Sequence, residues 1–389
     1  MHGAGASIAV GCCLLLLANR SMAQELPRSP EWLVDLPNAL HEAGVDVSLA
    51  TTLESTAAVS GHDRDRASSA HAQLLDLGIE FDLERARLLP ATTLRFAFSQ
   101  RAGDPESIGA DAIQGSSGLD ARNGDQLYGL NLTYAPDEHC RYVGGLIDSN
   151  DTFAALASTG DFIHASAGTS PTIVGMPTWP DTALGAQFHL SWSSGWELNV
   201  GAFRAIPKTA QLQPLGAAVL ELPRRELDQG IFSVAEVGWR SQRGGNRFGV
   251  GTWYDASQTE QLDQTVSRGS NGAYALWEHT LFDRRSFGAD AFAVLGWTEP
   301  ELTDAATHAM VGLRLRGPLQ TRPHDSFGLL VSLAGPNLLA EGRNEMVTEA
   351  YYRAALTELL HLQLGAIHTQ ARSDSRDSLV FGFRFSHAF

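Results

Sequence analysis

The sequence has little positive charge, few cysteines and no hydrophobic run long enough for a membrane-spanning helix. Lysine occurs once, at Lys208, and 28 basic residues stand against 44 acidic ones, which gives a net charge of -16. This acidic balance excludes the basic surface that nucleic-acid binding requires. The longest apolar stretch, Ala4–Ala18, is too short to cross a bilayer as a helix.

That apolar stretch is typical of a secretory signal peptide. Its leucine run, Leu14–Leu17, is followed by Ser21-Met22-Ala23, which places small residues where signal peptidase requires them. We expect cleavage after Ala23, which makes residues 1–23 the signal peptide. A lipoprotein signal is the alternative, but at Cys12 the leucines follow the cysteine instead of preceding it.

Cysteine usage fits an exported protein. Cys12 and Cys13 would leave with the signal peptide, so Cys140 would be alone in the mature chain. One cysteine can form neither an internal disulfide nor a metal cluster. Because Cys140 lies in a turn-like stretch between two strand patterns, we interpret it as a bystander. We predict no metal and no cofactor.

Alternation of apolar and polar residues dominates the rest of the chain. Residues 186–192 and 196–202 alternate on either side of Ser193-Ser194-Gly195, which predicts a hairpin with one apolar face. The same pattern returns at 231–240, 247–254, 273–281, 287–297, 309–316, 327–333 and 360–366. Helical spacing is convincing in residues 30–44 alone, which predicts a short helical segment over 24–44 before the strand-rich domain of 45–389.

The last strand separates a soluble sandwich or propeller from an outer-membrane barrel. Its apolar face carries Leu379, Phe381, Phe383, Phe385 and Phe389, and its other face carries Ser378, Gly382, Arg384 and Ser386. Bacterial outer-membrane barrels commonly end in this way, because their assembly machinery reads the terminal strand. We therefore predict an all-β transmembrane antiparallel barrel.

Charged residues fix which face of each strand points inward. Arg314 and Arg316 share one face of their strand, and pointing them at lipid would cost up to about 2–4 kcal/mol each near the midplane. About 16 strands fit the chain at roughly 23 residues per strand and connection, and barrels of that size hold an aqueous channel. Closure would pair the last strand with the first, at 45–53. The predicted pore-lining residues are Arg314, Arg316, Glu349, Arg353, Arg384, Glu278 and Asp290, and the same test turns Glu236 and Arg240 inward.

The C-terminal third resembles the carbohydrate-selective outer-membrane porins of the OprB type. The segment 317–329, GPLQTRPHDSFGL, resembles that family's glycine-proline, arginine and aspartate-glycine segment. Glu345, Glu349 and Tyr351-Tyr352-Arg353 resemble its penultimate strand. Leu362-Gln363 resembles the start of another family segment, although Leu364-Gly365 replaces the usual Pro-Asp. Residues 145–153, 161–163 and 178–181 resemble its central strand-loop segments, so the resemblance covers about 127–389, with a weaker match at 74–98.

The resemblance implies a 16-stranded barrel in the outer membrane of a Gram-negative bacterium. Its constriction would be lined by arginines and acidic residues and would pass monosaccharides such as glucose by passive diffusion. The implied partners are these sugars, outer-membrane lipids with lipopolysaccharide, and the barrel-assembly machinery through Phe389. Family members differ in oligomeric state, so a homotrimer and a monomer both stay open.

Two other functions remain as alternatives. A general or anion-selective porin would share the barrel pattern, and the abundance of arginine also fits a GC-rich genome. A barrel enzyme such as a lipase would need a nucleophile, a base and an orienting group, yet the sequence has no G-x-S-x-G, H-E-x-x-H or P-loop motif. Tryptophans near the strand ends favour an interfacial girdle over a sugar-stacking surface; they are Trp192, Trp196, Trp239 and Trp297.

Overall fold

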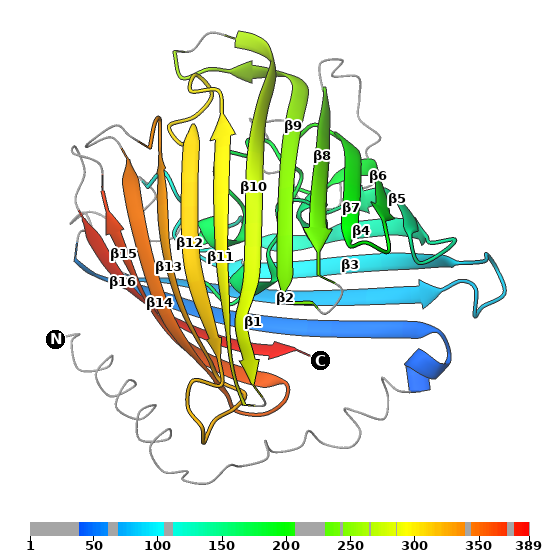
Figure 1. Ribbon diagram of the computed structural model, residues 1–389, viewed down its shortest axis with the longest axis horizontal. Helices are drawn as coiled ribbons and strands as arrows, with labels where there is room; N and C mark the ends of the chain where they lie inside the picture. Colours follow the sequence, from blue (N-terminus) through cyan, green and yellow to red (C-terminus); the bar gives the residue numbers. More distant parts are fainter. Residues whose placement is uncertain are drawn as a thin grey trace.

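Sixteen antiparallel strands close into one barrel (Figure 1). The computed structural model describes residues 39–60, 69–104, 112–206, 230–241, 244–263, 266–284, 286–338, 344–371 and 377–388. The first strand, β1 (Val45–Ser60), pairs with the last, β16 (Ser378–Ala388), so that Leu53 lies opposite Phe385. This pairing leaves no open edge, and it confirms the predicted fold class and the predicted closure.

The strands between these two follow one another around the ring in chain order. They are β2 (Ser69–Asp82), β3 (Thr92–Gly103), β4 (Gly124–Tyr134), β5 (Cys140–Ile147), β6 (Ala183–Ser191), β7 (Trp196–Arg204), β8 (Ile231–Arg240), β9 (Asn246–Glu260), β10 (Val266–Arg284), β11 (Phe287–Thr298), β12 (Thr307–Arg316), β13 (Ser326–Gly335), β14 (Glu345–Ala355) and β15 (Leu360–Gln370). The predicted strands and the predicted hairpin across Ser193-Ser194-Gly195 therefore occur, most of them extended by several residues. The half-buried thiol of Cys140 opens β5 instead of lying in the turn before it.

Of the helical segment predicted over 24–44, the structure describes residues 39–44. Residues 39–42 form one helical turn, which ends at Gly44, where a φ of +81° suits glycine. The signal peptide of 1–23, the rest of the expected helix up to residue 38, and Phe389 lie outside the described residues. Within the part of the chain that the structure describes, no helix has the length and apolarity to cross a membrane.

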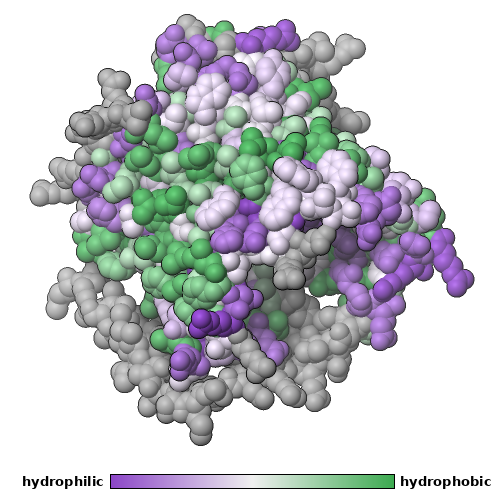
Figure 2. Space-filling model, in the orientation of Figure 1, coloured by the Kyte–Doolittle hydropathy of each residue, from purple (hydrophilic) through white to green (hydrophobic). Residues whose placement is uncertain are grey.

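The outer face of the barrel is apolar. On β16, Phe381 is 50% exposed, whereas Val380, which points inward, is 3% exposed. Figure 2 shows hydrophobic side chains across the middle of the face formed by β9 to β12, with hydrophilic ones at the top, where β9 and β10 end. Trp196 lies opposite Trp239 on this outer face, as expected for an interfacial girdle.

The connections differ between the two ends of the barrel. Short turns at 135–139, 192–195, 241–245 and 356–359 occupy one end, and longer connections such as 104–123 and 148–182 occupy the other. In outer-membrane barrels the short turns are periplasmic and the long loops extracellular.

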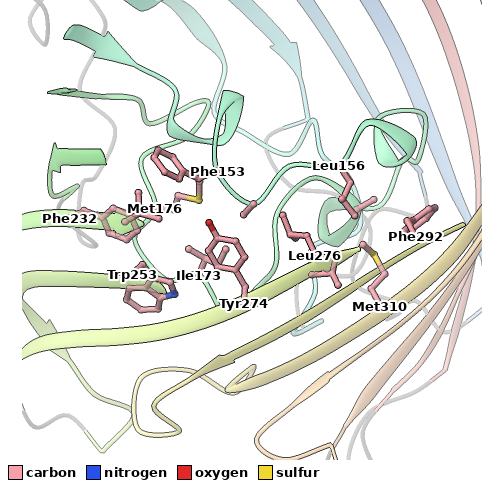
Figure 3. Close-up of a cluster of buried hydrophobic side chains, with 14 of the residues drawn as sticks. Phe153, Leu156, Ile173, Met176, Phe232, Trp253, Tyr274, Leu276, Phe292 and Met310 are labelled. Atoms are coloured by element: carbon pink, nitrogen blue, oxygen red, sulfur yellow. The ribbon is translucent and has the colours of Figure 1, made fainter. Parts of the chain in front are cut away.

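The hydrophobic core lies inside the barrel. Residues 148–182, which we call the lumenal loop, join β5 to β6 and carry the short helical elements η1 (Ser149–Asp151), η2 (Ala157–Thr159) and α3 (Ala165–Gly168). Phe153, Leu156, Ile173 and Met176 of this loop pack against the strands (Figure 3). Their partners are inward-facing side chains of β7 to β14, which we call the covered wall: Phe203, Phe232, Trp253, Tyr274, Leu276, Phe292, Met310, Leu330 and Tyr351.

The opposite wall is polar. We call it the open wall and define it by five inward-facing residues of β1 to β3: Asp46, Ser48, Asp76, Glu80 and Arg95. Asp46 and Ser48 are exposed, and the other three are partly exposed. Water therefore reaches the inward side of the open wall, whereas the lumenal loop covers the opposite wall.

Candidate functional site in the barrel lumen

Two of the predicted pore-lining carboxylates hold the lumenal loop. Glu349 of β14 accepts hydrogen bonds from the backbone N–H groups of Ile163 and His164, at 2.7 and 2.9 Å. Glu278 of β10 accepts one from the backbone N–H of Ser158, at 2.6 Å. Glu349 is fully buried and Glu278 is 8% exposed. Both side chains point inward as predicted, but they lie beneath the loop instead of facing the channel.

Two of the predicted arginines meet on one loop carboxylate. Asp161 lies 3.0 Å from Nη2 of Arg314 and 3.3 Å from Nη1 of Arg353. The hydroxyl of Tyr351 also donates a hydrogen bond to Asp161, at 3.3 Å. The two arginine side chains remain about one quarter exposed, at 25% and 24%. Asp161 of the lumenal loop therefore fixes the orientation of both guanidinium groups, and part of each side chain stays accessible to a solute.

Arg384 joins the last strand, the first strand and the loop. Its Nη2 lies 2.6 Å from the Glu54 carboxylate on β1, and its Nη1 donates to the Phe162 carbonyl at 3.3 Å. The side chain of Arg384 is 13% exposed. Because most of its donors are used within the protein, Arg384 has little capacity left for a solute.

Arg316 and Asp290 form a separate pair on neighbouring strands. Nε of Arg316 lies 2.9 Å from Asp290, and Nη1 lies 3.4 Å from Asp283. The Thr280 hydroxyl donates a hydrogen bond to Oδ1, the other carboxylate oxygen of Asp290, at 2.7 Å. Arg316 is 39% exposed, whereas the Asp290 side chain is 11% exposed. Of this pair, the guanidinium is the group that solvent reaches.

Other charged residues near the channel were not among the predicted pore-lining residues. Arg95 of the open wall lies 2.9 Å from Asp151 of the lumenal loop, and Arg122 lies 2.9 Å from Asp181. The Trp179 indole N–H donates to the Ser99 hydroxyl at 3.1 Å. Alternation along single strands gave no signal for these contacts, because the loop residues come from segments with no strand pattern.

Burial shifts the pKa values of two side chains of the lumenal loop. Burial raises the pKa of Asp148, although its hydrogen bonds from the backbone N–H groups of Trp179 and Asn150 oppose the shift. Burial, with the nearby His308, lowers the pKa of His164 to about 3, so the ring is neutral at physiological pH. Its Nδ1 accepts a hydrogen bond from the Ser166 backbone N–H at the start of α3.

The lumen thus offers guanidinium donors and carboxylate acceptors beside an aqueous passage. Such groups can exchange hydrogen bonds with the hydroxyls of a polar solute. Among the described residues, no group of three or more potential metal ligands lies close together.

Comparison with known proteins identifies relatives of this chain. The profile described as "Carbohydrate-selective porin, OprB family" matches residues 66–389. The high-pH structure of Pseudomonas putida OprB superposes with a TM-score of 0.81 at 15% identity, covering 95% of this chain and all of that one. The low-pH structure of the same protein gives a TM-score of 0.60 at 14% identity, with coverages of 93% and 97%.

A more distant structural match is OmpT of Vibrio cholerae, in a variant that lacks loop L8. Its TM-score is 0.52 at 10% identity, with 89% of this chain and 99% of that chain covered. OmpT is described as an outer-membrane protein, and the family whose profile matches this chain is one of porins, which are channels. No curated protein sequence matches the chain.

Proposed function

The chain belongs to the carbohydrate-selective porin family of the OprB type, and on that premise we propose that it lets monosaccharides such as glucose diffuse passively through the outer membrane. The observation that supports a sugar channel is the partly exposed cluster of Arg314 and Arg353 around Asp161. A planar guanidinium presents several N–H donors in a fixed geometry, which suits adjacent sugar hydroxyls.

Side-chain exposure divides the predicted pore-lining residues into those that can contact a sugar and those that cannot. Arg314, Arg316 and Arg353 keep between about one quarter and two fifths of their side chains exposed and can donate to a passing solute. The buried members of the predicted set instead hold the loop or the wall; they are Glu278, Glu349, Asp290 and Arg384. Sugar binding has to stay weak, because a tightly held solute blocks its own passage. An affinity of about 1 mM, or about −4 kcal/mol, would satisfy this condition.

A conservative double substitution tests the proposal. Arg314→Lys with Arg353→Lys keeps both charges and their attraction to Asp161 but removes the planar donor geometry. In planar bilayers we expect glucose to block the ion current of the parent channel, and the double variant to need severalfold more glucose. Arg322→Lys, in the 317–325 connection between β12 and β13, is the matched control. Equal block in parent and double variant would remove these arginines from the proposed sugar site.

The same recordings separate the alternatives. A channel that no monosaccharide blocks, and whose reversal potential follows the anion gradient, would be an anion-selective porin. We propose that the protein is not an enzyme, and a lipase assay on the purified protein in detergent tests the rival function. Native mass spectrometry of the extracted protein distinguishes a homotrimer from a monomer.

Export is part of the proposal. We propose that the chain is cleaved after Ala23, crosses the inner membrane and enters the outer membrane through the barrel-assembly machinery, which would recognise the strand ending at Phe389. Lipopolysaccharide would then contact the extracellular end of the barrel. N-terminal sequencing of outer-membrane fractions should begin at Gln24, and a lipid on Cys12 would contradict this.

A further inference from the structure

The lumenal loop contains a backbone conformation that requires support. Ala154 follows η1 with a φ of +57°, in the left-handed region that side chains other than glycine rarely adopt. This conformation costs about 1–2 kcal/mol for an alanine. Ala154 is 8% exposed, and the neighbouring Phe153 is fully buried against Phe203, with the ring centroids 6.3 Å apart. The turn is therefore fixed within the core instead of extending into the channel.

Two inward-facing side chains on the neighbouring strands β8 and β9 bind this turn. Glu236 of β8 accepts a hydrogen bond from the Ala154 backbone N–H, at 3.0 Å. Arg247 of β9 donates a hydrogen bond to the carbonyl oxygen of Ala155. The two side chains also pair with each other, with Nη2 of Arg247 2.5 Å from Oε1 of Glu236. One ion pair thus binds a donor and an acceptor of the same strained turn.

The pair is buried and is supported on its other sides. Glu236 is fully buried, and the Arg247 side chain is 8% exposed. The Tyr274 hydroxyl of β10 donates to Oε2 of Glu236 at 2.9 Å, and Glu197 of β7 lies 3.5 Å from Nε of Arg247. In such a setting each charge is compensated by its partner, and removing one partner leaves the other buried and unpaired.

The strand pairing around this pair is made by the backbone. Glu236 lies opposite Asn199 on β7 and Gly251 on β9, and the backbone ladders of these strands are continuous across it. The ladders do not need the two side chains in order to pair. What the side chains add is a fixed position for residues 154 and 155 relative to the wall.

We propose that Glu236 and Arg247 form a positioning clamp that holds the lumenal loop against β8 and β9 and thereby sets the free width of the channel. The predicted effect of the clamp on ion current does not depend on the proposed function. Its predicted effect on sugar block does, because it rests on the proposed sugar channel. Release would let the start of the loop move into the passage that the open wall borders. Both residues are positioning residues, because neither faces the passage itself.

A pair of substitutions at residue 154 tests the clamp from the loop side. Ala154→Pro removes the N–H that Glu236 binds and cannot adopt a positive φ, whereas Ala154→Gly keeps the N–H and tolerates that φ. In single-channel recordings we expect Ala154→Pro to raise the variance of the open-channel current roughly twofold or more, since pore dimensions control flow. Ala154→Gly should keep the variance of the parent. Heat-modifiable migration on gels establishes that each barrel is closed.

Variants of the wall test the same clamp without changing the loop. Exchanging the charges with Glu236→Arg and Arg247→Glu preserves an ion pair but places a donor against the Ala154 N–H and an acceptor against the Ala155 carbonyl. We expect this exchange to raise the current variance, as does the neutral pair Glu236→Gln with Arg247→Gln. Arg322→Gln removes an arginine from the buried Asp325 carboxylate, away from β8 and β9, and is the matched control.

The outcomes separate the two proposals. Closed barrels whose current variance equals that of the parent, in either series, would overturn the clamp. Failure of both series to form closed barrels would also overturn it, because the pair would then serve assembly instead of loop position. If glucose does not block the parent channel, the sugar channel is wrong, yet the comparison of Ala154→Pro with Ala154→Gly still decides the clamp.

Discussion

The covered wall and the open wall share an apolar outer face but differ in what they point inward. On β11, the inward-facing Phe292 of the covered wall is 1% exposed, while Leu295, on the outward face of the same strand, is 56% exposed. On β2 and β3 of the open wall, Glu80 and Arg95 face the lumen and remain partly exposed. Strands that carry apolar residues on both faces therefore indicate where a barrel wall is covered by a loop, and strands with one polar face indicate where water reaches it.

This comparison predicts that the two walls respond differently to truncation. Phe292 packs edge-on against Phe162 of the lumenal loop, with the ring centroids 5.6 Å apart. We expect Phe292→Ala to lower the free energy of unfolding by about 3–5 kcal/mol, through lost burial and the cavity that remains. Arg95→Ala, an equally severe truncation on the open wall, removes an exposed ion pair and should cost about 1 kcal/mol or less. Urea titration of the heat-modifiable band measures both, and similar losses would contradict the difference between the walls.

A second contrast compares two inward carboxylates. Glu349→Ala would leave the Ile163 and His164 backbone N–H groups buried without their acceptor, at a cost of about 3 kcal/mol. Glu80→Ala on the open wall removes a partly exposed carboxylate and should change stability by about 0.5 kcal/mol or less. We also expect Glu80→Ala to shift the ion selectivity of the current toward anions, measured as a change in reversal potential, because exposed lumenal charge selects ions. Equal stability losses for the two variants would mean that Glu349 does not anchor the loop.

A third contrast concerns room for an aromatic ring inside the barrel. Gly328 faces the lumen on β13, and a Cβ there would lie 2.1 Å from the Tyr351 ring and 2.8 Å from the Phe162 ring. Gly328→Ala should therefore destabilise the protein by about 1–3 kcal/mol through overpacking. Gly144, where a Cβ would meet nothing within 4 Å, offers the matched control, Gly144→Ala. Unfolding curves that coincide for the two variants would show that the ring above Gly328 can move at little cost.

Much of the barrel could be predicted from the sequence. Alternation with a period of two identifies strands, and the cost of charge in lipid turns Arg314, Glu349 and Arg384 inward, where the structure has them. The candidate site could be predicted less well. Exposure decides whether an inward side chain meets a solute, and the exposure of Glu349 depends on loop residues that lie 185 and 186 positions away in the chain.

The sequence by itself determined the strands, their order and the lipid-facing side, because each rests on local periodicity and on the large cost of placing charge in hydrocarbon. It also contained the family resemblance in segments 161–163 and 178–181, though no role could be assigned to them. Only the tertiary structure decided that these segments enter the lumen, that Asp161 gathers Arg314 and Arg353, and that Glu236 and Arg247 hold a strained turn. Such contacts join residues far apart in the chain, and their energy depends on burial that no local pattern encodes.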